Sequence, residues 1–111
     1  MAGTPKRVGP LALTTTLTTN VYVPPSSLIG EILRHIHIAN KTGTAATFTL
    51  YLGATGANAA GTELWVAKNV AANDAFDFYC AIELLSTDFL VGGSGTATAL
   101  TITMALDQYV L

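Results

Sequence analysis

Two histidines, His35 and His37, have the residue type and spacing that best fit a metal site. In a β-strand, residues i and i+2 face the same way, so both imidazoles would lie on one side of the strand. A metal site built on such a pair needs a third ligand, and the nearest downstream acidic residue is Glu63. The sequence therefore favours two imidazoles on a half-solvated face or at a subunit contact, and we expect no metal and no cofactor.

Neither of the two nucleophile candidates has the surroundings that catalysis needs. Ser94 follows two glycines, but Thr96 breaks the G-x-S-x-G pattern and no strand-to-helix elbow is expected there. Cys80 lies on the apolar side of an alternating segment, which is typical of a buried, inert thiol. We therefore expect no catalytic residue, and the protein is predicted not to be an enzyme.

The carboxylates do not form a recognisable catalytic or calcium-binding pair. Asp77 and Glu83 share one face of a predicted strand, but six residues of strand separate them by about 20 Å. Glycosidase pairs lie about 5–9.5 Å apart. Asn73 and Asp74 precede Asp77 without the EF-hand spacing, so we expect a turn that caps the following strand.

Aromatic residues are the strongest candidates for binding. Tyr51 and Tyr79 have outward parity in their predicted strands, and together with Trp65 and Tyr22 they could form a sugar-stacking platform. Aromatic side chains are equally favoured at protein interfaces. We assign Tyr51, Trp65 and Tyr79 to partner binding and keep a carbohydrate platform as the alternative.

These residues belong to short segments in which apolar and polar side chains alternate with a period of two. Such alternation predicts half-buried antiparallel strands. Breaker-rich turns separate them, and the longest predicted loop, Gly53 to Glu63, consists almost entirely of small residues. We predict an all-β fold, a single antiparallel β-sandwich of seven or eight strands, jelly-roll-like or Ig-like. The expected strands cover 11–17, 21–23, 32–38, 47–52, 64–70, 74–84, 89–91 and 100–107.

The parity of these strands also predicts the core. The residues expected to be buried between two sheets are Phe48, Leu50, Phe76, Phe78, Ile82, Leu100, Ile102 and Met104.

Length and composition exclude several classes of protein. With 111 residues, 50% hydrophobic and 11% charged, the chain is one folded domain and not a disordered one. The net charge of −2 offers no basic field for nucleic acid, and no apolar run is long enough to span a membrane. A single cysteine excludes an internal disulfide, and the N-terminus has no secretory signal, which predicts a protein made in a cytoplasm. Because so few charges cover the surface, we expect neighbouring subunits to cover part of it.

Residues 1–9 do not follow the alternating pattern of residues 10–111. Pro5 and Pro10 flank the chain's only adjacent cations, Lys6 and Arg7. We predict an extended N-terminal arm that docks on a neighbouring subunit through Lys6 and Arg7, with little effect on the stability of the sandwich. A frayed terminus is the alternative.

The sequence resembles small β-sandwich virion proteins of tailed bacteriophages over residues 28–107. The resemblance is carried by Ile32 to Gly43 (ILRHIHIANKTG), then Ala46 to Leu52 (ATFTLYL), then a small-residue loop and a closing strand from Leu100 to Met104. In such proteins a strand pair of the type I-x-N-x-T-G-x-x-x-T-F-T-L-Y is followed by a loop of this kind.

The resemblance implies a structural role in a virion assembled in the cytoplasm of a bacterial host. The leading hypothesis is a capsid decoration protein that binds the major capsid protein and copies of itself, as a trimer. A tail, collar or fibre component is the alternative within the virion, and a carbohydrate-binding module is the alternative outside it. The resemblance assigns no role to individual residues.

Overall fold

The computed structural model describes residues 3–25, 30–53 and 62–109, and these residues form eight β-strands. No helix in these ranges is long and apolar enough to cross a membrane. The predicted loop from Gly53 to Glu63 lies mostly outside the described residues. The strands are β1 (Thr4–Ala12), β2 (Asn20–Tyr22), β3 (Gly30–Asn40), β4 (Ala46–Gly53), β5 (Glu63–Val70), β6 (Ala75–Leu84), β7 (Phe89–Ser94) and β8 (Leu100–Tyr109).

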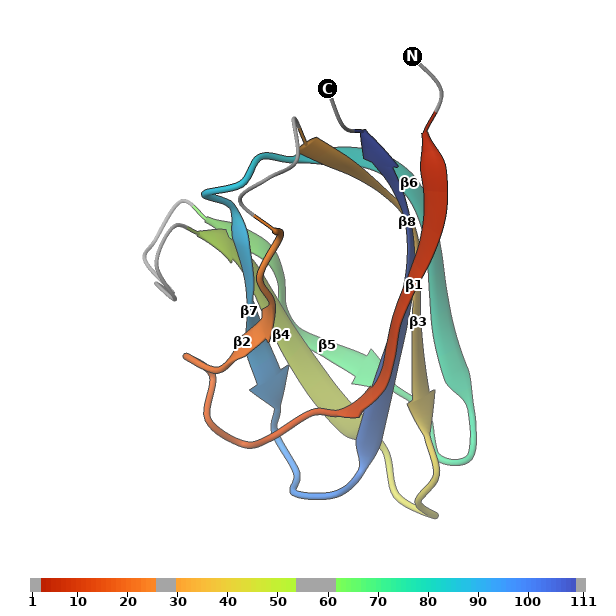
Figure 1. The fold of residues 1–111 in the computed structure, drawn as a ribbon. Coiled ribbons are helices and arrows are strands. Elements are labelled where there is room, and N and C mark those ends of the chain that lie inside the picture. Colours follow the sequence, from red (N-terminus) through yellow and green to blue (C-terminus); the bar gives the residue numbers. More distant parts are fainter. Residues whose placement is uncertain (1–2, 26–29, 54–61, 110–111) are drawn as a thin grey trace.

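The strands form two four-stranded antiparallel sheets, sheet A in the order β1-β8-β3-β6 and sheet B in the order β2-β7-β4-β5 (Figure 1). The first strand pairs with the last, the second with the seventh, the third with the sixth and the fourth with the fifth. These four pairs follow the order of one long hairpin. The additional pairings of β3 with β8 and of β4 with β7 join the pairs into two sheets. This is the jelly-roll topology, so the predicted all-β sandwich is confirmed and the jelly-roll alternative is the one observed.

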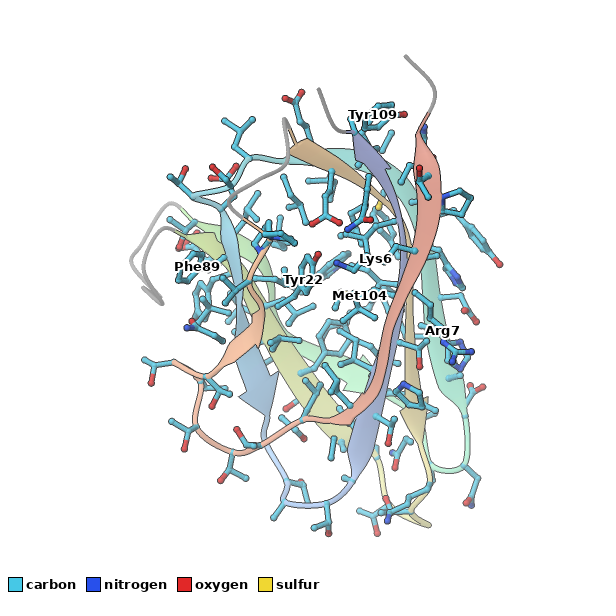
Figure 2. The ribbon with its side chains drawn as sticks, in the orientation of Figure 1. Lys6, Arg7, Tyr22, Phe89, Met104 and Tyr109 are labelled. Carbon is cyan, nitrogen blue, oxygen red and sulfur yellow. The ribbon has the colours of Figure 1, made fainter. Side chains whose placement is uncertain are left out.

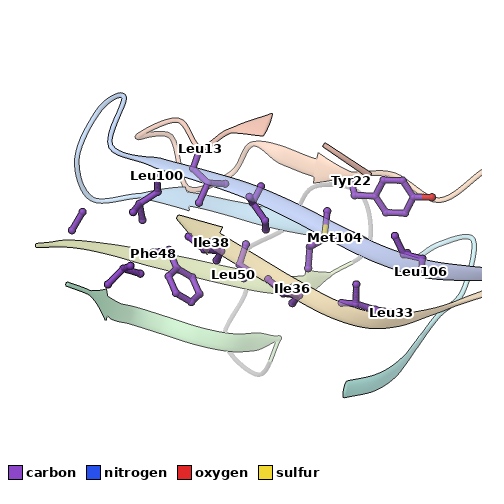
Figure 3. Packing of buried hydrophobic residues seen from close by; sticks show 14 of the residues in the cluster. Leu13, Tyr22, Leu33, Ile36, Ile38, Phe48, Leu50, Leu100, Met104 and Leu106 are labelled. Carbon is purple, nitrogen blue, oxygen red and sulfur yellow. The ribbon is translucent and has the colours of Figure 1, made fainter. Parts of the chain in front are cut away.

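The core lies between the two sheets and contains most of the residues that parity predicted (Figure 3). Phe48, Leu50, Leu100, Ile102 and Met104 are almost completely buried.

The prediction was only partly confirmed for one strand of the core. Phe76 and Ile82 pack against the core but are only half-buried, and Phe78 is 37% exposed. All three lie on β6, which is an edge strand of sheet A. An edge strand has a neighbouring strand on one side only. A side chain that points inward from it can therefore remain in contact with water.

Residues 4–9 are part of the sandwich, which differs from the predicted arm. They belong to β1, which pairs with β8 from Thr4↔Gln108 to Ala12↔Thr101. The register shifts between Val8 and Leu11, where Gly9 has a φ of 91°. This bulge disrupts the alternation, which explains why the sequence pattern did not reveal the strand.

The strand expected over 89–91 also extends further, because β7 runs to Ser94 and includes Gly92 and Gly93. A Cβ on Gly93 would lie 2.3 Å from the carbonyl oxygen of Thr14, and one on Gly92 would lie 2.0 Å from that of Thr49. Glycine is required here because neighbouring backbone approaches β7 closely, not because the chain turns.

Candidate functional site

The candidate site lies on the outer face of sheet A, and a β-bulge in β3 creates it. Leu33 is fully buried, and so is Ile36, three residues later. The register of β3 against β8 shifts between Leu33 and His35, so Arg34 is an extra residue on β3. The shift turns His35 and His37 to the outer face, although Leu33 has the same odd parity and faces the core.

Asp77 joins the two histidines from the neighbouring strand. On β6 it lies directly opposite His37. Its Oδ1 atom lies 2.7 Å from His35 Nε2 and 2.7 Å from His37 Nδ1. Hydrogen bonds from His37 and then His35 hold the pKa of Asp77 below its usual value. The three side chains therefore form one compact N₂O group, which is half-exposed to solvent.

The surroundings of this group restrain it. Tyr79, opposite His35 in register, stacks on the His35 ring with 4.2 Å between centroids and 2° between planes. Arg7 on β1 lines an open hollow of about 370 Å³ together with both histidines. Arg34 is engaged elsewhere, because its Nε donates to Asp107 Oδ2 over 2.9 Å.

A third potential ligand lies beside the two histidines, although the sequence predicted none. That prediction rested on the lack of a carboxylate soon after His37, and the structure supplies Asp77 from 40 residues further along the chain. The outward parity of Asp77 was visible in the sequence. Its position opposite His37 required the β3–β6 pairing, which no local pattern encodes.

Lys6 does not lie with Arg7 on a docking arm. Its side chain enters the space between the sheets, whereas Arg7 points outward (Figure 2). Lys6 Nζ donates to Tyr22 Oη over 2.7 Å and lies 3.7 Å from Glu31 Oε2, and Tyr22 Oη donates to Glu31 Oε1. Burial, the hydrogen bond to Glu31 and the nearby Glu31 charge raise the pKa of Tyr22. Lys6 thus has a structural contact where partner binding was predicted.

The proposed aromatic platform is not assembled. Tyr22 is buried, Tyr51 lies on β4 in sheet B, and Tyr79 lies on β6 in sheet A. Trp65 is half-buried and packs edge-on against Phe78, with centroids 4.9 Å apart. Arg7 and Tyr79 are the two predicted partner-binding residues that the fold places on one outer face.

Three other side chains have local structural contacts. Ser94 is buried, and its Oγ donates to the carbonyl of Thr96 and accepts from the Thr96 amide. Cys80 is half-buried and donates to the carbonyl of Leu33; burial raises the pKa of its thiol. Asp74 accepts a hydrogen bond from the Ala75 amide at the start of β6, in keeping with the predicted capping turn.

Comparisons with known proteins add little to this geometry. No protein-family model matches the chain, and no curated protein matches it. Among solved structures, the coat protein dimer of Tobacco streak virus matches with 12% identity and a TM-score of 0.36, covering 97% of this chain and 86% of that one. A likeness this weak carries no argument about function. The class of protein rests on the strand order described above: an eight-stranded jelly-roll domain.

Proposed function

We propose that the protein is a non-enzymatic structural component of a virion, a decoration protein that attaches to the capsid of a tailed bacteriophage. The jelly roll is a fold that capsid proteins use, although lectins and cupins use it as well. The resemblance of residues 28–107 to phage virion proteins favours the capsid use.

The observation that carries the proposal is the side of the sandwich formed by β5 and β6, here called the β5–β6 side. Each is an edge strand with a single paired neighbour among the described residues. The two strands carry exposed apolar side chains: Val66 on β5 is 63% exposed, Phe78 on β6 is 37% exposed, and Tyr79 on β6, which faces outward from sheet A, is 76% exposed. An exposed edge with apolar side chains is the kind of surface that a stable soluble monomer avoids.

The rest of the charge distribution supports assembly. The chain has only twelve charged side chains, five basic and seven acidic, and the Lys6–Glu31 pair lies partly inside the sandwich. Little charge is left to keep copies apart. We propose that the coat subunits cover the β5–β6 side, and that the protein self-associates as a trimer at three-fold positions of the shell.

The copy number in purified particles tests this role. A decoration protein is present in hundreds of copies per particle, whereas a collar or tail-tip protein is present in about a dozen. Absence from the particles would overturn the virion role. A copy number of about a dozen would indicate a neck or tail protein instead of a decoration protein.

A matched pair of variants tests the surface. Val66→Asp places a charge on the β5–β6 side and should reduce occupancy on particles that lack the native protein. Leu11→Asp places the same charge at a 40% exposed position on β1, the opposite edge of sheet A, and should leave occupancy unchanged. Equal occupancy for both variants would remove the β5–β6 side from the interface. Sedimentation equilibrium tests the trimer, whose mass is three times 11.5 kDa.

A further inference from the structure

His35, His37 and Asp77 present one ligand atom each to a common point on the outer face of sheet A. All three atoms lie within 4.8 Å of one another. Two nitrogens and one oxygen already converge, because both imidazoles make 2.7 Å contacts to the same Asp77 Oδ1 atom. The strands that carry them are hydrogen-bonded neighbours, so folding brings the donors together before any ion arrives.

We propose that this cluster binds one divalent late transition-metal ion, with zinc as the reference ion. His35 Nε2, His37 Nδ1 and the Asp77 carboxylate are the protein ligands, and water takes the fourth position. Imidazole nitrogen suits zinc, copper and nickel, whereas calcium and magnesium take all-oxygen sites. The inference does not depend on the virion role.

The ion requires the three ligand atoms to rearrange. Bonds of about 2.0–2.2 Å in a tetrahedron place the ligand atoms about 3.3 Å apart. The two histidine contacts to Asp77 measure 2.7 Å, so the carboxylate must withdraw by roughly half an ångström. The two histidine nitrogens lie within 4.8 Å of each other, so rotation of the rings must bring them closer by up to about 1.5 Å. Each neutral imidazole then carries its proton on the nitrogen that does not face the ion.

Two features of the sheet hold the histidines in place. The bulge at Arg34 sets both rings on the outer face, and the sheet pairs β3 on both sides, with β8 and with β6. Tyr79 stacks flat on His35 and limits rotation of that ring. An aromatic neighbour that orients a ligand contributes to affinity without touching the metal.

Arg7 opposes the binding of a cation. It lines the same hollow as His35 and His37, and the ion with Asp77 would add a net positive charge beside it. Removing the guanidinium by Arg7→Gln should therefore tighten zinc binding. The gain should shrink as salt is raised, because the interaction is between exposed charges. A purely structural role for the cluster would not produce this response.

The experiment is a calorimetric titration of metal-free protein with zinc chloride. The protein must carry no histidine tag, because His35 and His37 are the only histidines in the chain. We expect one ion per chain. His37→Gln and Asp77→Asn should each weaken binding about 100-fold, and Tyr79→Ala about 10-fold.

Two control variants address other potential ligands. Asp107→Asn changes a carboxylate that pairs with Arg34 instead of joining the cluster, and it should bind zinc as the native protein does. Cys80→Ser removes the single thiol and should also leave zinc binding unchanged. The imidazole signals in a ¹H–¹⁵N spectrum provide a second readout, since both must shift when zinc is added.

Two results would overturn the proposed metal site. One is a stoichiometry well below one zinc ion per chain, and the other is native zinc affinity in a His35→Gln/His37→Gln double variant. If a variant melts at a lower temperature than the native protein, its titration is repeated well below that melting temperature. Loss of zinc binding by the folded variant then shows that a metal ligand was removed and not that the protein unfolded.

Discussion

Lys6 Nζ lies 3.7 Å from Glu31 Oε2, so the first strand supplies the positive charge that faces a fully buried carboxyl group. Tyr22 completes the trio by donating to the other carboxyl oxygen of Glu31 and accepting from Lys6. Among the described residues, Glu31 Oε2 has no hydrogen-bond donor. The ion pair with Lys6 is therefore the main interaction that offsets the burial of this oxygen. Lys6 therefore links β1 to the interior of the sandwich.

Replacing this lysine should destabilise the fold. Lys6→Met keeps most of the apolar stem but leaves Glu31 without its cation, and removing one partner of a buried pair costs about 3 kcal/mol. Urea unfolding measures the loss. Arg7→Met is the matched control, because Arg7 is exposed on the same strand and should change stability by less than about 0.5 kcal/mol. Equal effects of the two substitutions would contradict the assignment.

Deleting residues 2–9 tests the placement of the N-terminal segment. The deletion removes most of β1, including Lys6, and exposes the edge of β8. We expect a large drop in melting temperature or loss of cooperative unfolding, because a paired strand and a buried charge contact both disappear. A nearly unchanged melting temperature, which the docking-arm hypothesis predicts, would show that β1 adds little to the fold.

Two phenylalanines with the same inward parity should differ in their contribution to stability. Phe48 is fully buried between the sheets, so Phe48→Ala should cost about 3–5 kcal/mol. Phe78 lies on the edge strand β6 and keeps contact with water, so Phe78→Ala should cost about half as much. Denaturant melts of the two variants give the comparison, and a larger loss at Phe78 would mean that the edge is better covered than the structure indicates.

Asn40 should be the most sensitive polar residue of the β3–β4 turn. It is almost completely buried, donates through Nδ2 to the carbonyls of Thr44 and Val70, and accepts through Oδ1 from the amide and hydroxyl of Thr42. Asn40→Ala leaves these groups unpaired and should cost about 2–3 kcal/mol. Thr44→Ala keeps the Thr44 carbonyl that Asn40 uses and should cost much less. Thermal melts of the pair test this difference.

Tyr22 should make stability sensitive to alkaline pH. Burial, followed by the hydrogen bond to Glu31 and the Glu31 charge, raises the pKa of Tyr22 above its ordinary value of 10.0. A group whose pKa is higher in the folded state contributes stability below about pH 10, and this contribution is lost as the pH rises through the folded pKa. The free energy of unfolding should fall above about pH 10.

Tyr22→Phe isolates the phenol in that experiment. The substitution removes only the hydroxyl that accepts from Lys6 and donates to Glu31, and it keeps the aromatic ring. The variant should show a shallower decline in stability above about pH 10. Ultraviolet absorbance of native protein should also show one of the four tyrosines ionising only at unfolding. Parallel curves for the two proteins would remove Tyr22 as the cause.

The sequence by itself determined the fold class and most of the core. Strict alternation in 46–52 and 100–106 is a local property of a pleated strand, so the burial of Phe48, Leu50, Ile102 and Met104 followed without knowledge of the partners. Alternation does not say which strand pairs with which. The jelly-roll order, the edge position of β6 and the exposure of Phe78 are consequences of pairing over long sequence separations.

The candidate site depended on tertiary structure for the same reason. His35 and His37 were visible as a pair, but only the bulge at Arg34 and the β3–β6 register place them on the outer face opposite Asp77. Lys6 and Arg7, adjacent in sequence, were assigned together to an arm, yet the pleat of β1 sends one toward Glu31 and the other to the surface. Local chemistry therefore identifies residues capable of binding, whereas strand pairing decides which of them meet, because each ladder joins residues tens of positions apart.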